Sequence, residues 1–158
     1  INSPEFTLML ENIGEFSRFI MTGANFLREK QYYEVSKRSK TILNIHIGDP
    51  NKFRGLDSNY WSLLENKKSK PVVTLHHANL KLDTGEILFQ VESDFTFEEL
   101  TLEKLIKFEI EAVKKCMNIA FSINEKTPID SVYKNVGIYR SAMSAEEKKE
   151  AFKSLRQK

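Results

Sequence analysis

The stretch from residue 71 to residue 123 reads PVVTLHHANLKLDTGEILFQVESDFTFEELTLEKLIKFEIEAVKKCMNIAFSI, and it decides the fold. From Glu86 to Phe97 apolar and polar residues alternate, which predicts a strand with one buried face. A preceding strand pairs with it through a turn at Gly85, a residue that tolerates positive φ. Alternation on both strands selects one register for the hairpin, with the pairs Leu82–Ile87, Leu80–Phe89, Ala78–Val91 and Val72–Phe97.

A long amphipathic helix is predicted directly after this hairpin. Thr101 is suited to be its N-cap, and Glu103 places a carboxylate in the first turn, where the helix dipole favours it. The apolar residues form one broad arc, made of Leu102, Leu105, Ile106, Ala112, Val113, Cys116, Met117 and Ala120. This arc is too wide for a lone surface helix, so we expect one flank on the hairpin and the other on a second helix.

Glu109 interrupts the apolar arc, one turn from Leu105 and from Val113. A carboxylate buried there alone would be costly or would take up a proton. Three interpretations follow. Glu109 is paired internally with an Arg, a Lys or a backbone donor, or it lies at a groove or subunit interface, or it is a catalytic acid or base.

The other predicted elements complete an α+β domain. They are a helix from Leu8 to Lys30, a strand from Thr41 to Ile47, and a short helix capped by Asp57 or Ser58. We predict an antiparallel sheet of three or four strands with helices packed on one face. Ser144 and Glu147 form a capping box for a charged C-terminal helix, predicted to fray or to lie over the surface.

Size and composition indicate one soluble domain. The 158 residues are 41% hydrophobic and 29% charged, with a net charge of +2 that favours neither nucleic acid nor an acidic partner. We assign residues 7–143 to the domain and 144–158 to the C-terminal helix, and we interpret residues 1–6 as remnants of a cloning site. The single Cys116 is expected to be a buried, inert thiol. Without an apolar run of membrane-spanning length, a cytoplasmic location is expected, although an anchoring segment can be missing from the chain.

Two candidate binding surfaces emerge from aromatic and charged residues. The predicted partner-binding residues are Glu109, Phe53, Tyr60 and Trp61. The first helix carries a narrow apolar stripe that is typical of a helix pair or a dimer. The alternative is a nucleic-acid surface built from Tyr32, Tyr33, Lys37, Arg38, Lys52, Arg54, Lys67 and Lys68.

No pattern of catalytic or metal-binding residues stands out. His76 and His77 are adjacent on a strand and face opposite sides, and His46 can join one of them only if its strand lies alongside. No acidic ligand has the spacing of a metal site, so no metal is predicted. Asp83-Thr84-Gly85 is interpreted as a hairpin turn.

The sequence therefore predicts a non-enzymatic protein-interaction domain of adaptor, chaperone-like or assembly type, with no cofactor. Its partner is expected to be another protein or a second copy of the chain. A nucleic-acid-associated module and the soluble domain of a membrane-anchored assembly are the alternatives. An enzyme built around Glu109 and a histidine is the remaining hypothesis.

Overall fold

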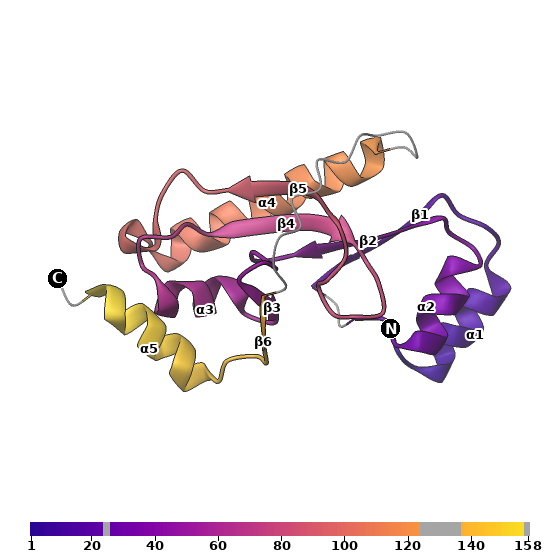
Figure 1. Cartoon of the computed structure of the whole chain (residues 1–158), viewed down its shortest axis with the longest axis horizontal. Helices are drawn as coiled ribbons and strands as arrows, with labels where there is room; N and C mark the ends of the chain where they lie inside the picture. Colours follow the sequence, from indigo (N-terminus) through magenta and orange to yellow (C-terminus); the bar gives the residue numbers. More distant parts are fainter. Residues whose placement is uncertain (24–25, 124–136, 157–158) are drawn as a thin grey trace.

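The computed structural model of the chain describes residues 1–23, 26–123 and 137–156 and is built around a four-stranded sheet (Figure 1). The strands follow the spatial order β1-β2-β4-β5. Their bounds are Arg18–Thr22, Thr41–His46, Val72–His77 and Ile87–Glu92. β1 pairs with β2 in parallel, whereas the other two pairings are antiparallel. The fold is α+β, as predicted, but its sheet is mixed rather than antiparallel.

The remaining elements of the described residues are five α-helices, one short 3-10 helix and two short strands. The helices are α1 (Pro4–Asn12), α2 (Glu29–Ser36), α3 (Ser58–Glu65), α4 (Leu102–Ser122), α5 (Ala145–Arg156) and the 3-10 helix η1 (Phe97–Glu99). Strands β3 (Phe53–Gly55) and β6 (Ile138–Arg140) pair in parallel as a separate two-stranded sheet.

The N-terminal region differs from the single helix predicted from Leu8 to Lys30. It forms α1, then β1, then α2. The apolar spacing that predicted one helix combines residues of α1 with Ile20, which belongs to β1. The chain leaves β1 at Gly23, where φ is +61°. Because β1 was not foreseen, its parallel pairing with β2 was not foreseen either.

Residues 1–6 take part in this region, and their origin in cloning stays a prediction. Ser3 caps α1, where its Oγ accepts a hydrogen bond from Phe6 N at 3.2 Å. α1 and α2 pack against one face of β1 and β2, where Leu10 and Val35 are buried with Ile42.

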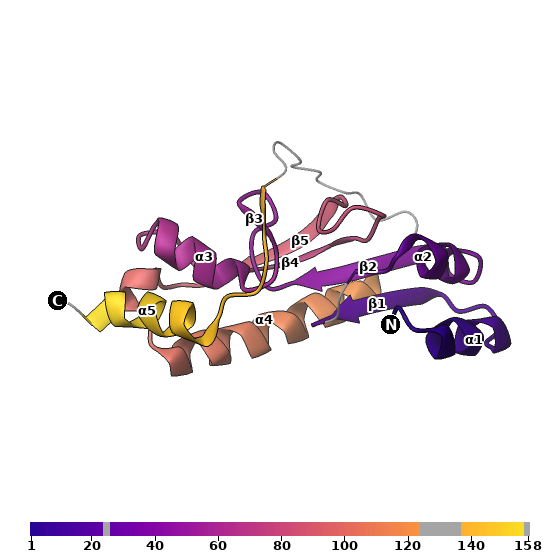
Figure 2. The same ribbon diagram turned by 90° about the horizontal axis from the view of Figure 1, so that it is seen from below.

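Helix α4 covers the opposite face of the sheet (Figure 2). Thr101 caps it as predicted, with its side chain accepting from Lys104 N. Ala112, Cys116 and Ala120 of α4 pack against the central strands. The strand residues buried in this core are Leu43, Ile45, Val73 and Leu75. The helices therefore lie on both faces of the sheet, not on one.

Part of the α4 arc contacts other helices, as expected, because Leu105 is buried in one cluster with Leu63 of α3 and Ala151 of α5. Leu102 and Ile106 are 50% and 48% exposed, so the predicted second helix contact is wrong for these positions. Among the residues that the structure describes, no helix is both long enough and apolar enough to span a bilayer.

The register of the predicted hairpin is also wrong. Phe89 pairs with Leu75 rather than Leu80, and Val91 pairs with Val73 rather than Ala78. Phe89 and Val91 do pack toward α4, as expected. The difference arises because β4 ends at His77, and the residues up to Glu86 leave the sheet as a loop instead of extending the strand.

Helix α5 begins with the predicted capping box. Ser144 N donates to Glu147 Oε2 at 2.7 Å, and Glu147 N donates to Ser144 Oγ at 3.1 Å. The helix does not merely lie over the surface, because Ala151 is fully buried and Phe152 packs edge-on against Tyr60 of α3.

Candidate functional site

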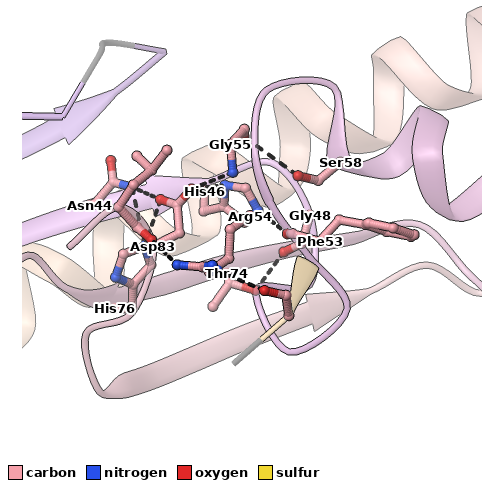
Figure 3. Close-up of polar contacts among 12 residues, drawn as sticks. Asn44, His46, Gly48, Phe53, Arg54, Gly55, Ser58, Thr74, His76 and Asp83 are labelled. Carbon is pink, nitrogen blue, oxygen red and sulfur yellow. Dashed lines mark hydrogen bonds and ion pairs between the residues drawn. The ribbon is translucent and has the colours of Figure 1, made fainter. Parts of the chain in front are cut away.

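Polar side chains from two neighbouring strands meet on the sheet face opposite α4 (Figure 3). Asn44 and His46 are two residues apart on β2, so both point away from the core side chains Leu43 and Ile45. The antiparallel register places His76 of β4 opposite Asn44. Three polar side chains thus share one small area of the sheet.

Asp83 enters this area from the loop between β4 and β5. Its Oδ1 accepts a hydrogen bond from Asn44 Nδ2 at 3.0 Å, and its Oδ2 accepts one from the backbone N of Gly55 at 2.8 Å. His46 Nδ1 lies 3.4 Å from Oδ2, and His76 Nε2 lies 3.5 Å from Oδ1. Asp83 is buried, so these four neighbours form the surroundings of its carboxylate.

The surroundings keep Asp83 ionised. Burial by itself raises the pKa of the Asp83 carboxyl, but its contacts with the side chains of His76 and His46 and with the N–H of Gly55 outweigh it. The pKa therefore falls below its usual value of 3.8. A carboxylate with a lowered pKa is fully charged at neutral pH and can accept a proton.

The contacts of His76 fix the orientation of Asn44. His76 Nδ1 lies 2.7 Å from the backbone oxygen of His77, which can only accept, so Nδ1 carries the hydrogen. With the hydrogen on Nδ1, Nε2 can accept from Asn44 Nδ2 at 3.1 Å. Both amide hydrogens of Asn44 are engaged, one with His76 and one with Asp83.

His46 has an oxygen atom at each ring nitrogen. Nε2 lies 3.1 Å from the backbone oxygen of Phe53, and Nδ1 faces Asp83. Burial lowers the pKa of His46 below 6.5, although Asp83 and the Phe53 carbonyl oppose that shift. The neutral ring has one hydrogen for these two acceptor oxygens, so one ring nitrogen faces its oxygen with no hydrogen between them. The His46–Asp83 pair can therefore take up one further proton.

The segment from β2 to α3 is held close above the site. Thr74 Oγ1 donates to the Gly48 carbonyl at 2.7 Å. Gly55 has a φ of +97°, and a Cβ there would lie 2.1 Å from the backbone oxygen of Arg140. Glycine is therefore required at the position whose N–H binds Asp83.

A cavity of about 290 Å³ opens beside these residues. Asn44, His46 and Asp83 line it from the sheet and its loops, and Asn59, Tyr60 and Glu109 line it from α3 and α4. Three exposed apolar side chains, Phe26, Leu56 and Tyr139, also belong to its wall. The cavity joins an ionised carboxylate to a partly apolar space, which is the usual setting of a small-molecule site.

Glu109 contributes a second carboxyl group to the cavity. Its Oε1 accepts from Asn59 Nδ2 at 3.0 Å, and Asn59 also exchanges two hydrogen bonds of 3.1 Å with the backbone of Val72. Burial raises the pKa of Glu109 above 4.5; the Asn59 bond opposes this, and the charge of Asp57 adds to it. The partner of Glu109 is thus a neutral amide, not the basic side chain or backbone donor considered from the sequence.

The other predicted partner-binding residues lie in two different settings. Tyr60 lines the cavity together with Glu109. Phe53 is 3% exposed, and the guanidinium of Arg140 lies 5.8 Å from its ring centroid. The same guanidinium lies 5.0 Å from the ring of Trp61. Phe53 and Trp61 therefore contact the C-terminal part of their own chain.

The predicted nucleic-acid residues are spread over three parts of the fold. Tyr32, Tyr33, Lys37 and Arg38 belong to α2 or its C-terminal end; Lys52 and Arg54 lie at β3; Lys67 and Lys68 follow α3. α2 and α3 lie toward opposite ends of the molecule (Figure 1). Lys37 and Arg38 are both paired with Glu34. The structure does not bring this set together as one stripe.

Sequence reasoning missed the cluster of Asn44, His46, His76 and Asp83. Its signals were an Asn and a His two residues apart on a predicted strand, and an Asp in a turn that could fold back over that strand. Asp83 was interpreted as a turn residue alone, because the predicted hairpin kept it at the far end of the sheet. Among the described residues there is no group of three His, Cys, Asp or Glu side chains suited to a metal ion.

Comparison with known proteins gives matches by structure alone. No protein-family model and no curated protein matches the sequence. The formyltransferase PseJ from Anoxybacillus kamchatkensis, solved with a UDP-linked formamido sugar and tetrahydrofolate, superposes with a TM-score of 0.66 at 23% identity. HypX from Aquifex aeolicus, solved with tetrahydrofolic acid, gives 0.67 at 18%, and a 4-N formyltransferase from Francisella tularensis gives 0.63 at 18%.

The alignments cover most of this chain but less of the other proteins. They include 94%, 92% and 96% of this chain, against 74% of PseJ, 25% of HypX and 65% of the Francisella enzyme. At these identities the similarity shows a common fold. This chain therefore has a formyltransferase-like fold.

This finding corrects the functional predictions made from the sequence. A non-enzymatic protein-interaction or oligomerisation domain was expected, with a nucleic-acid module as the alternative, but the proteins that share the fold are formyltransferases. The expected protein partner is likewise contradicted, because the structural neighbours were solved with tetrahydrofolate or a nucleotide sugar. The prediction failed because the residues of the candidate site are far apart in sequence and were judged one by one.

Proposed function

We propose that this chain carries the catalytic centre of a formyltransferase, which moves a formyl group from a formyl derivative of tetrahydrofolate to a primary amine. The observation that carries the proposal is the ionised Asp83 carboxylate, set between Asn44 and His46 at the wall of a cavity. The fold of the chain supports the same reaction class. We further propose an amino sugar linked to a nucleotide as the acceptor.

The chemistry requires one proton acceptor and one group that stabilises an oxyanion. The amine nitrogen attacks the formyl carbon, the carbonyl oxygen gains negative charge, and the bond from carbon to the folate nitrogen then breaks. The His46–Asp83 pair takes the proton that the amine loses, since the neutral ring and the carboxylate, 3.4 Å apart, can together take up one further proton. The pair then passes this proton to the folate nitrogen as that nitrogen leaves, so protons and charge balance.

Asn44 and His46 are the neutral polar groups beside Asp83 on the cavity wall. The Asn44 amide is held by His76 and by Asp83, so it is preorganised for the formyl oxygen as it becomes negative. Asn44 also holds Asp83 in place in the absence of substrate. When Asp83 accepts a proton, it becomes a weaker acceptor for the hydrogen bond from Asn44. The Asn44 hydrogen can then be donated to the oxyanion.

Two substrates must reach the same carboxylate in a group transfer. Asn44 and Asp83 line the main cavity and also a small neighbouring recess whose apolar wall includes Met21, Leu27 and Tyr32. The recess measures about 20 Å³ and holds little more than a water molecule, so we propose that donor and acceptor both reach Asp83 through the main cavity. Glu109, with its raised pKa, is proposed to hydrogen-bond a polar group of the acceptor from the α4 side of the main cavity.

The experiment measures formyl transfer and folate binding in parallel. The protein is incubated with a formyl donor and a set of amino sugar nucleotides; tetrahydrofolate release is followed by absorbance and the formamide product by mass spectrometry. Asp83→Asn and His46→Asn should each reduce kcat by about a thousandfold or more, whereas the exposed Glu111→Gln on α4 should not.

Tetrahydrofolate binding by calorimetry provides the second measurement. Binding should survive in Asp83→Asn, because that change removes the proton acceptor and retains the size of the side chain. If the unaltered protein neither binds tetrahydrofolate nor forms a formamide with any acceptor, the proposal is wrong.

A further inference from the structure

The C-terminal part of the chain returns to the candidate site and pairs with the segment above it. β6 lies beside β3, and α5 lies beside α3, in both views of the fold (Figures 1 and 2). We define residues 137–152 as the C-terminal strap. Three backbone hydrogen bonds join the strap to the segment that follows β2: Gly137 N to Pro50 O at 3.0 Å, Ile138 N to Lys52 O at 2.8 Å and Leu56 N to Arg140 O at 3.3 Å.

Asp57 and Lys148, which we call the latch, hold the strap near its middle. Asp57 Oδ2 accepts from the backbone N of Met143 at 2.9 Å, and Asp57 Oδ1 lies 2.9 Å from Lys148 Nζ. One carboxylate therefore binds both the chain before α5 and the first turns of α5. Asp57 itself has a φ of +57° at the start of α3, a conformation that needs such support.

Side chains continue the connection toward Asp83. Arg54 Nε donates to the Gly137 carbonyl at 2.7 Å, and Arg54 Nη1 donates to the Leu82 carbonyl at 3.3 Å. One guanidinium thus bridges the strap and the residue that precedes Asp83. Gly55, the next residue of β3, donates its N–H to Asp83 Oδ2. The strap, β3 and the Asp83 loop form one continuous hydrogen-bonded unit.

From this arrangement we infer that the C-terminal strap is a positioning element for the Asp83 carboxylate, with Lys148 and Arg54 as its positioning residues. The strap fixes the position of β3, and this position lets the Gly55 N–H reach Asp83 Oδ2. Arg54 links the loop that carries Asp83 to the strap, because it donates to both Leu82 O and Gly137 O. The inference rests on the proposed function for its catalytic consequence, but the mechanical coupling can be measured without any substrate.

The test variant is Lys148→Gln, which removes the cation of the latch. Lys148→Arg is the conservative rescue, because it keeps the charge beside Asp57. Lys153→Gln is the matched control on the same helix, since Lys153 is exposed and its partner is Glu150 at 3.7 Å. Amide hydrogen exchange, followed by NMR on the whole chain, reports the opening of each hydrogen bond.

In Lys148→Gln, exchange should accelerate about fivefold at the Leu56 and Ile138 amides, which measure strap docking, and also at the Gly55 amide. Lys148→Arg should restore all three rates, and Lys153→Gln should change none. Asp83→Asn, a reference, should accelerate exchange at Gly55 without changing Ile138. This pattern would identify Asp83 as the group that protects the Gly55 amide.

Either of two exchange results would overturn the inference. One is faster exchange at Leu56 and Ile138 with no change at Gly55, which would uncouple the strap from Asp83. The other is unchanged exchange at all three amides, which would mean that the latch does not hold the strap. If Lys148→Gln is poorly folded, Arg54→Gln is measured in the same way, with faster exchange expected at Gly55 and at Ile138.

Kinetics provide the second measurement. Lys148→Gln should lower kcat about threefold to tenfold and leave both KM values within about twofold, because misplacement of Asp83 affects the transition state more than substrate binding. Lys148→Arg should recover kcat. If exchange behaves as expected but the unaltered protein transfers no formyl group, the proposed function fails while the coupling stands. If transfer occurs and kcat does not change in Lys148→Gln, the catalytic part of the inference fails.

Discussion

Replacement of Glu109 by Gln should separate the folding of this domain from its reaction. The structure gives Glu109 a neutral partner, since its Oε1 accepts from Asn59 Nδ2 at 3.0 Å. A Gln side chain has the same shape and also offers an oxygen to that amide. The change therefore removes a buried carboxyl group and keeps its hydrogen bond.

The size of the effect follows from two opposing contributions. A neutral acceptor gives a weaker hydrogen bond than a carboxylate, a loss of about 1 kcal/mol at most. In the other direction, a Gln side chain avoids the free-energy cost of burying a charged carboxylate, the same cost that raises the pKa of Glu109. We expect the free energy of unfolding to change by less than about 1 kcal/mol at neutral pH. A cationic partner would instead make the loss about 3 kcal/mol, because its charge would be left unpaired.

The pH dependence has a definite sign. The pKa of Glu109 in the folded protein lies above its usual 4.5, so as pH rises the unfolded chain loses this proton first. The folded state then binds more protons than the unfolded state, and the stability of the unaltered protein falls relative to that of Glu109→Gln. Between about pH 4 and about pH 7, the free energy of unfolding of Glu109→Gln should therefore rise relative to that of the unaltered protein.

Urea unfolding followed by the fluorescence of Trp61, the only Trp of the chain, measures both quantities. Glu111→Gln is the control, because Glu111 is exposed on the same helix. The difference in unfolding free energy between this variant and the unaltered protein should not show the same change with pH. A loss near 3 kcal/mol at neutral pH would refute the reasoning, and so would a pH trend of opposite sign. In the transfer assay, Glu109→Gln should raise the KM of the acceptor about tenfold, with little effect on folate binding.

Three other substitutions and one labelling experiment have outcomes that follow from the surroundings of single residues. Asn59→Ala should lower the free energy of unfolding by about 3 kcal/mol in urea, because three hydrogen bonds of its buried side chain are lost. Asp83→Asn should reduce acid sensitivity: the lowered pKa of Asp83 stabilises the fold above pH 3.8, and this contribution disappears as pH falls through the folded pKa, which acid titration by circular dichroism would show. Gly55→Ala should cost about 2 kcal/mol or more in thermal unfolding, since its Cβ would lie 2.1 Å from Arg140 O. Cys116 should react with a thiol reagent at mildly alkaline pH only after unfolding, because burial raises its pKa to about 11.

Elements with a strong local signal could be predicted from the sequence. Thr101 and the apolar spacing after it defined the start and the buried side of α4, and Ser144 with Glu147 defined the start of α5. These features depend on residues within one or two helical turns. For the same reason the strand from Thr41 was found with its correct start.

Pairing between strands was harder, because alternation continues past the end of β4. Leu80 and Leu82 extend the apolar pattern, although they belong to a loop. Asn79 organises that loop by accepting from Lys81 N at 2.9 Å and from Thr84 Oγ1 at 2.9 Å. A period of two residues cannot distinguish a strand from a loop that contains apolar side chains, so the predicted register was shifted.

The candidate site could not be derived from spacing, because its geometry depends on that loop. Asn44 and His46 come from β2, but Asp83 reaches them only if the chain leaves the sheet after His77. A straight hairpin would have carried Asp83 beyond the end of β2. The position of the site thus depends on where β4 ends, which is also the feature that made the predicted register wrong.

The conformation of Asp83 indicates that this residue does more than make a turn. Its φ is +50°, a region in which Gly or Asn is the less costly residue, and its carboxylate is buried and ionised. A turn needs neither the strain nor the buried charge. Both are tolerated because Asn44, Gly55, His46 and His76 surround the carboxylate, and these groups come from separate segments of the chain. Strain and charge that only tertiary contacts can maintain are typical of a functional site, and here they coincide on a carboxylate that lines the cavity beside His46.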